Sequence, residues 1–105
     1  MLRKPHKYGP QKDFFKISHK IIELKAWKDL TPTAAKLYTY LCHCRNRHTQ
    51  RYKDYFFRSD RQIKKDTGFA FDTIIKGRKE LNGSFINYVP GKGKKRSKYQ
   101  IMDLP

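Results

Sequence analysis

Acidic residues are scarce in this chain. Its 105 residues include nine Asp and Glu against 25 Lys and Arg, which gives a formal net charge of +16 at pH 7. Because 37% of the residues are hydrophobic and 14% are aromatic, the chain has enough apolar material to fold and does not have the composition of a disordered basic tail. A folded domain with such an excess of positive charge is expected to bind a polyanion.

Long hydrophobic runs are also absent. No stretch approaches the roughly 20 apolar residues that a membrane-spanning helix needs. The basic N-terminus leads into aromatic residues interrupted by lysines, unlike the apolar core of a signal peptide. No expected helix joins a broad apolar face to a basic one, which argues against binding to an anionic membrane. The sequence therefore predicts a cytoplasmic protein without a membrane partner.

Cysteine is limited to Cys42 and Cys44, and two thiols in a cytoplasmic chain argue against a disulfide. Cys44 and His48 have a spacing that two zinc ligands could use on a helix, but a closed zinc site needs four ligands and no second pair is present. The acids are scattered, no Ser or Cys nucleophile has a convincing base, and no phosphate-binding glycine loop precedes a helix. We therefore expect no metal, no cofactor and no catalysis, and interpret the thiols as small core residues.

A capping box and a glycine indicate two helices joined by a tight turn. Ser59 and Gln62 have capping-box spacing, so a helix should begin at Asp60. Gly68 is the residue best able to adopt the left-handed conformation that ends this helix. One face of the next helix is expected to pack, and it comprises Ile74, Arg78 and Leu81, flanked by Phe71 and Gly77. The opposite face is expected to be free for a partner, and it comprises Asp72, Ile75, Lys76 and Lys79.

A basic hairpin follows these helices. Ile86 and Tyr88 alternate with polar neighbours before a turn at Pro90–Gly93. Tyr99 and Ile101 alternate after it, which is typical of two half-buried strands. Between the strands lie Lys92, Lys94, Lys95, Arg96 and Lys98. These cations are unsuited to packing, because each would have to be desolvated, and they are suited to contacts with phosphates or a minor groove.

The N-terminal half is expected to support this unit. Residues 1–12 are interpreted as a flexible basic arm outside the core, and residues 13–105 as a single domain. Thr31 and Pro32 predict the start of the longest helix, of about 14 residues, through a hydroxyl cap and a proline in the first turn. Its core face is expected to comprise Ala34, Leu37, Tyr38, Leu41 and Cys44.

Shorter elements complete the expected fold. Ser18 should cap a short helix that carries Ile21, Ile22 and Leu24 inward, with Trp27 and Leu30 filling the space behind it. Short strands are expected at residues 14–17 and 55–57, the second pairing with the hairpin. The predicted fold class is α+β, a winged helix-turn-helix with three or four helices, a small antiparallel sheet and a basic β-hairpin wing.

Several short segments carry a resemblance that extends from Phe14 to Met102. They are FFKIS at 14–18, LTPTAAKLYTYL at 30–41, SDRQI at 59–63, TGF at 67–69, KEL at 79–81 and FI at 85–86. In their order and spacing the chain resembles the winged helix-turn-helix proteins of phages, plasmids and conjugative elements, particularly the winged domains of replication-initiation proteins. The resemblance implies that the helix after Gly68 enters the major groove of DNA and that the hairpin flanks it.

The candidate DNA-binding residues form three groups. The first belongs to the helix before Gly68 and to its start, where phosphate contacts are expected, and comprises Arg58, Ser59, Arg61, Lys64 and Lys65. The second belongs to the following helix and comprises Asp72, Thr73, Ile75, Lys76 and Lys79. Within it the two lysines are favoured for base contacts, Thr73 for a phosphate, and Ile75 for a thymine methyl group, a protein interface or simple exposure. The third is the hairpin group of Lys92, Lys94, Lys95, Arg96 and Lys98.

The sequence thus predicts a double-stranded-DNA-binding accessory protein of a mobile element, which recognises an origin of replication or of conjugative transfer and recruits larger machinery. A relaxase, a helicase or a replication protein is the candidate partner, and a homodimer that reads repeated half-sites is an open option. One alternative is a transcriptional repressor that occludes a promoter. Another is a basic RNA-binding domain, which exposed stacking aromatics would favour, whereas most Tyr and Phe here have core-compatible spacing.

Overall fold

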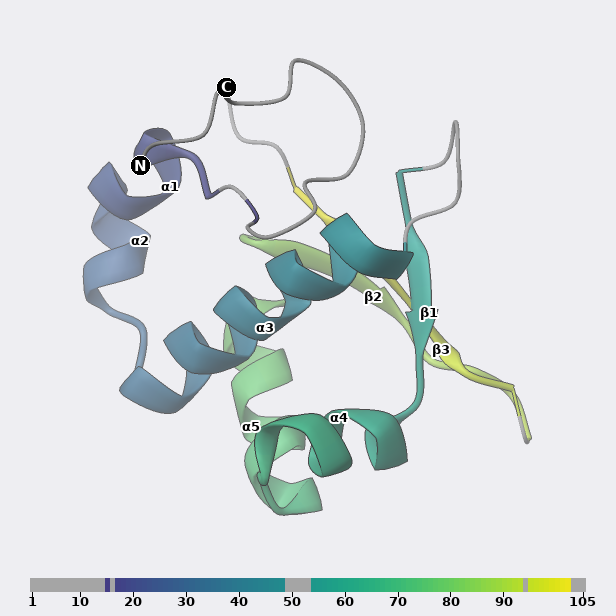
Figure 1. Ribbon diagram of the computed structural model, residues 1–105. Helices are drawn as coiled ribbons and strands as arrows, with labels where there is room; N and C mark the ends of the chain where they lie inside the picture. Colours follow the sequence, from purple (N-terminus) through teal and green to yellow (C-terminus); the bar gives the residue numbers. More distant parts are fainter. Residues whose placement is uncertain (1–14, 16, 49–53, 94, 103–105) are drawn as a thin grey trace, which may run out of the picture.

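The structure, a computed structural model, describes residues 15, 17–48, 54–93 and 95–102. The expected arm, residues 1–12, and Lys94 of the hairpin group lie outside this range. The described residues form an α+β fold of five helices and a three-stranded antiparallel sheet (Figure 1). The elements are α1 His19–Glu23, α2 Lys25–Lys28, α3 Pro32–His48, β1 Phe56–Arg58, α4 Asp60–Thr67, α5 Phe71–Leu81, β2 Ile86–Val89 and β3 Ser97–Ile101.

The longest helix, α3, supplies much of the core. Its five predicted core residues, from Ala34 to Cys44, are all buried. Thr31 Oγ1 accepts a hydrogen bond from Ala34 N at 3.2 Å, which confirms the predicted hydroxyl cap. The helix has 17 residues, somewhat more than expected. We find no candidate for a bilayer span among the described helices, α3 included.

The sheet has the strand order β1-β3-β2, with β3 antiparallel to both neighbours. Phe56 and Tyr88 lie opposite Tyr99, and Ile86 lies opposite Ile101. These side chains point to the core, so the predicted hairpin and the pairing of the predicted strand at 55–57 with it are confirmed, the latter one residue further along.

The segment before α3 differs from expectation in three respects. The described residues form five helices instead of three or four, because the extended backbone of Leu24 (φ −67°, ψ 142°) separates α1 from α2. Ile21 is buried, but Ile22 is 43% exposed, since neighbouring residues of so short a helix cannot both face the core. The strand predicted at 14–17 is wrong for its described residues, because Phe15 and Ile17 lie in no strand and pack, partly buried, against the core.

The helix that follows β1 begins and ends as predicted. Ser59 Oγ accepts a hydrogen bond from Gln62 N at 3.1 Å, and Gln62 Oε1 accepts one from Ser59 N at 3.0 Å, which is a complete capping box. Gly68 has the left-handed conformation, with φ 78°, and turns the chain into α5. The turn at Gly68 therefore sets the direction of α5 relative to α4. The buried face of α5 consists of Ile74, Gly77, Arg78 and Leu81, as expected. The prediction that Phe71 packs with them is wrong, because this first residue of the helix is 43% exposed.

Replacing Gly68 by Ala is expected to destabilise the protein by about 1–2 kcal/mol, the typical cost of holding a residue with a Cβ atom in the left-handed region. An added Cβ atom would meet nothing within 4 Å, so backbone strain accounts for the whole effect. Gly68→Asn should cost less, because Asn adopts this conformation more readily. Urea unfolding followed by circular dichroism measures both variants, and equal losses for Ala and Asn would contradict this explanation.

Candidate nucleic-acid interface

The Arg78 side chain joins α5 to α4 and to the sheet. This arginine is only 8% exposed. Its Nη1 donates to Asp60 Oδ1 at 2.7 Å and to the Tyr99 hydroxyl at 2.9 Å. The guanidinium carbon lies 4.1 Å from the centre of the Tyr88 ring. One side chain therefore connects the start of α4 with strands β2 and β3.

The Tyr99 phenol beside this arginine keeps its proton. Burial raises the pKa of Tyr99 to about 12, although the Arg78 guanidinium beside it favours the ionised form. Tyr99 is therefore a neutral phenol at physiological pH, and its oxygen accepts the hydrogen bond. Asp60 supplies the compensating charge, which a buried guanidinium requires.

Arg58 occupies a different place from the one predicted. It ends β1 and does not belong to α4, because the capping box starts that helix two residues later. Its guanidinium forms an ion pair with Asp66 and donates to the Tyr40 hydroxyl at 3.1 Å. The side chain is only 15% exposed. Arg58 thus stabilises the junction of β1, α3 and α4.

The same junction lowers the pKa of Asp66. The main cause is the hydrogen bond that the Tyr40 hydroxyl donates to Oδ2 at 2.6 Å, and the Arg58 guanidinium adds to it. Burial and the bond to Asp66 raise the pKa of Tyr40, so the phenol keeps its proton. Because the pKa of Asp66 is lower in the folded protein, its ionised carboxylate stabilises the fold at neutral pH. This stabilisation is lost as the pH falls through that pKa.

Exposed cations dominate the surface of α4. Its two acids, Asp60 and Asp66, form ion pairs with arginines outside the helix. Lys64 Nζ lies 4.6 Å from the centre of the Phe71 ring, across the turn to α5. The predicted phosphate contacts that are exposed on α4 are Arg61, Lys64 and Lys65. Ser59 has its hydroxyl in the capping box, so its side chain has a structural role.

The outward face of α5 carries the predicted residues. The exposed ones are Asp72, Ile75, Lys76 and Lys79, while Thr73 is half-buried. Glu80 is tied to the start of α3, because its carboxylate accepts from the Thr31 hydroxyl at 2.7 Å and from the Thr31 amide at 3.2 Å. The α5 face therefore offers two lysines, one apolar side chain and one carboxylate to a partner.

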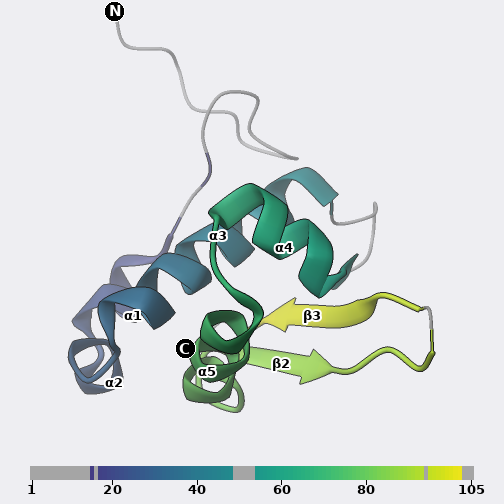
Figure 2. The same ribbon diagram turned by 90° about the horizontal axis from the view of Figure 1, so that it is seen from below.

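The β2–β3 hairpin extends the cationic surface beyond α5. Lys92, Lys95 and Arg96 are exposed, and Lys98 is half-buried. Ser97 Oγ accepts a hydrogen bond from Gly91 N at 3.2 Å, which ties the two arms together near the tip. Figure 2 shows α4, α5 and the hairpin on the side of the molecule that faces the viewer, with the tip projecting past α5. In Figure 1 the helices α1 and α2 lie away from this side.

Comparison with family models, curated proteins and solved structures gave no significant match to this chain. The candidate interface therefore rests on the geometry and charge of the described residues. Cys42 and Cys44 lie buried on α3 and are not joined in a disulfide, and burial raises the pKa of Cys44. Within the described ranges, no three His, Cys, Asp or Glu side chains gather in a way that could hold a metal ion.

The structure also shows a groove on the outer face of the sheet that the sequence patterns did not single out. Phe57 is 40% exposed and Val89 is 52% exposed on that face. The groove has a volume of about 560 Å³ and reaches the cations of the hairpin tip. Strand alternation could have predicted an exposed aromatic side chain on this face, because an inward Phe56 requires an outward Phe57.

Arg78→Ala is expected to lower the free energy of unfolding by about 2–3 kcal/mol, because it leaves Asp60 and Tyr99 without their partner. The loss should stay below that of a fully buried pair, since the Asp60 side chain is 35% exposed. Lys79→Ala, at the next and exposed position, is the matched control and should change stability by less than about 0.5 kcal/mol. Chemical unfolding compares the two, and similar losses would show that the bridge does not stabilise the fold.

Proposed function

We propose that the protein binds double-stranded DNA as a winged helix-turn-helix, with α5 in the major groove, α4 against phosphates and the β2–β3 hairpin as the wing. The observation that carries the proposal is the gathering of exposed cations on these three consecutive elements in a chain of net charge +16. Both acids of α4 are paired with arginines, so they do not offset this charge. Such a surface complements a phosphate backbone.

The shape of α5 supports its assignment to the groove. The helix has 11 residues and its exposed side carries the lysines Lys76 and Lys79, which lie one turn apart and therefore side by side. Lysine ammonium groups donate to guanine O6 and N7, and an apolar side chain such as Ile75 suits a thymine methyl group. The Arg78 bridge holds α4 and the hairpin at set positions beside α5. All three elements could then contact one duplex together.

We assign the role of an accessory protein at an origin of replication or of conjugative transfer on the resemblance to winged domains of mobile elements. In that role it would mark the site for a relaxase, a helicase or a replication protein. A footprint on the DNA that surrounds its own gene tests this assignment. Protection confined to a promoter would indicate a repressor instead.

Binding to a labelled duplex is expected to weaken steeply with salt. With about five to eight phosphate contacts, the log–log slope should lie between about −5 and −7, and affinity should fall roughly a thousandfold or more between about 50 and 200 mM salt. Fluorescence anisotropy titrations at several salt concentrations measure the slope. A flat response would overturn duplex binding.

The hairpin's share of this slope can be separated from the effect of net charge. Replacing Lys92, Lys95 and Arg96 together by Ala should make the log–log slope less negative by about two to three units. The matched control replaces the exposed lysines Lys20, Lys25 and Lys28 of α1 and α2, which removes the same charge away from the interface. That control should leave the slope nearly unchanged. Equal effects of the two triple variants would mean that the hairpin is only a solubilising turn.

Base reading and phosphate contact should respond differently to substitution. Lys76→Ala and Lys79→Ala are each expected to cost about 1–3 kcal/mol of discrimination between the cognate site and random duplex. Arg61→Ala and Lys65→Ala should weaken both duplexes alike, because phosphates carry no direct sequence information. Competition titrations with the footprinted site and a scrambled duplex provide the comparison. If all four variants behaved identically, α5 would not be the reading element.

A further inference from the structure

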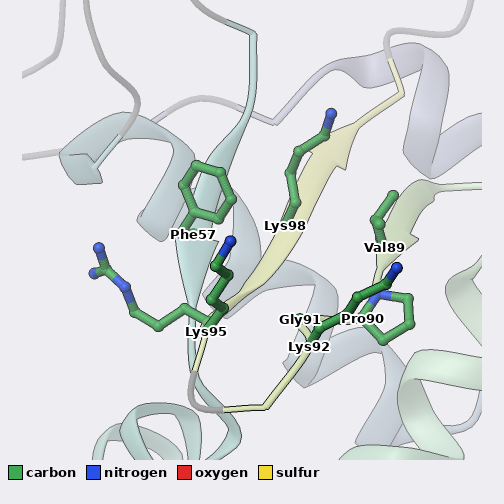
Figure 3. Close-up of a pocket in the computed structure, with 8 residues that line it drawn as sticks. Phe57, Val89, Pro90, Gly91, Lys92, Lys95 and Lys98 are labelled. Carbon is green, nitrogen blue, oxygen red and sulfur yellow. The ribbon is translucent and has the colours of Figure 1, made fainter.

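The outer face of the sheet carries a groove that duplex binding by α5 does not use. Phe57 on β1, Lys98 on β3 and Val89 on β2 are cross-strand neighbours, because the register pairs Lys98 with both of the others. Figure 3 shows these three side chains projecting from the same face, with Lys92 and Lys95 nearer the hairpin tip. The groove therefore joins an apolar floor to a cationic rim.

Aromatic rings are held in position at one end of the groove. The Phe57 ring packs edge to face against Tyr55, with ring centres 5.6 Å apart and an angle of 85° between the planes. Lys98 Nζ lies 4.7 Å from the centre of the Tyr55 ring. Phe57 thus has a packed neighbour on one side while 40% of its surface stays exposed. An ordered, exposed ring is suited to stacking with a flat partner.

The rim supplies positive charge without acids. Among the described residues that line the groove, four are cations and none is acidic; the cations are Lys92, Lys95, Arg96 and Lys98. The arms approach so closely at the tip that a Cβ atom at Gly91 would lie 2.1 Å from the Lys95 carbonyl oxygen. Glycine at this position is therefore required by the close approach of the two arms, which keeps the cations next to the apolar floor.

This combination favours a nucleic-acid strand over a protein surface. Lysine is depleted at the centre of protein–protein interfaces, whereas here it lies beside the exposed Phe57 ring. Proteins that bind single strands combine a positively charged groove for the backbone with aromatic rings for the bases. Paired bases inside a duplex cannot stack on a side chain in this way, so the strand must be unpaired.

We propose that this groove binds an unpaired DNA strand, with a base stacked on Phe57 and the adjoining phosphates against the cations of the rim. The choice of DNA over RNA rests on the proposed function, because the hairpin cations border both surfaces and the strand would continue from a bound duplex. An opened region beside the bound duplex would supply such a strand.

The test measures binding of a labelled oligo-dT of about ten nucleotides, a length typical of single-strand sites. Phe57→Ala should weaken it about tenfold to a hundredfold, the usual effect of losing a stacked base. Phe57→Leu, which keeps an apolar side chain but no ring, should also weaken it. Ile22→Ala is the matched control, since Ile22 is 43% exposed on α1, and it should bind like the parent protein. Thermal unfolding confirms that each variant is folded.

Parallel titrations with a duplex separate this inference from the proposed function. Phe57→Ala should leave duplex affinity unchanged, while Lys76→Ala should weaken duplex binding and leave oligo-dT binding intact. If oligo-dT binding depended on Phe57 and no duplex binding were detected, the proposed function would be contradicted and the assignment of the groove to a single strand would still be supported.

Three results would overturn the inference. The first is a folded Phe57→Ala variant that binds oligo-dT like the parent. The second is tighter, Phe57-dependent binding of an oligo-rU, which would identify the strand as RNA. The third is a change of oligomeric state in Phe57→Ala with no effect on oligo-dT, which would identify the face as a contact between two copies of the chain.

Discussion

The Arg78 guanidinium contacts Asp60 on α4, Tyr99 on β3 and Tyr88 on β2, so a single side chain from α5 connects all the elements that carry the candidate interface. Hydrogen bonds to a charged group have strict geometry, so this bridge constrains how these elements lie relative to one another. Loss of this bridge would therefore affect the relative placement of the cationic surfaces as well as stability. A partner that must touch several elements at once depends on that placement.

The two acids of α4 are used inside the fold. Asp60 and Asp66 pair with the two arginines that are largely buried, Arg78 and Arg58. Guanidinium groups suit such sites, because their planar fork reaches two partners and they are more weakly hydrated than ammonium groups. The lysines of α4, α5 and the hairpin tip are left at the surface. Pairing of the acids thus determines where the excess positive charge appears.

The hairpin has two distinct faces. Its inner face places Tyr88 and Tyr99 against Arg78 and the core, and its outer face places Val89 and Lys98 beside Phe57 of β1. Because strand residues alternate between faces, Phe56 of β1 packs in the core while the adjacent Phe57 lines the groove. The tip cations lie where both faces end. A duplex on α5 and a single strand on the outer face would therefore share the same cations.

Most elements of the fold could be predicted because the interactions that define them are local. The capping box spans Ser59 to Gln62, the left-handed turn depends on Gly68 alone, and the long helix starts from adjacent Thr31 and Pro32. Period-two alternation likewise predicted the hairpin. Prediction failed for Ile22 and for the described residues of the strand expected at 14–17, Phe15 and Ile17, where short apolar stretches have no single periodicity to set which side faces the core.

For the candidate site, the sequence by itself determined the charge and the exposed faces of α4, α5 and the hairpin. Only the tertiary structure decided which cations form ion pairs and hydrogen bonds inside the protein. Arg58 meets Asp66 across eight residues and Tyr40 across 18, and Arg78 meets Tyr99 across 21. The groove around Phe57 likewise needs β1 beside β3, which are far apart in the chain. Helix caps and strand alternation depend on neighbours along the backbone, whereas these contacts exist only after the core has brought distant segments together.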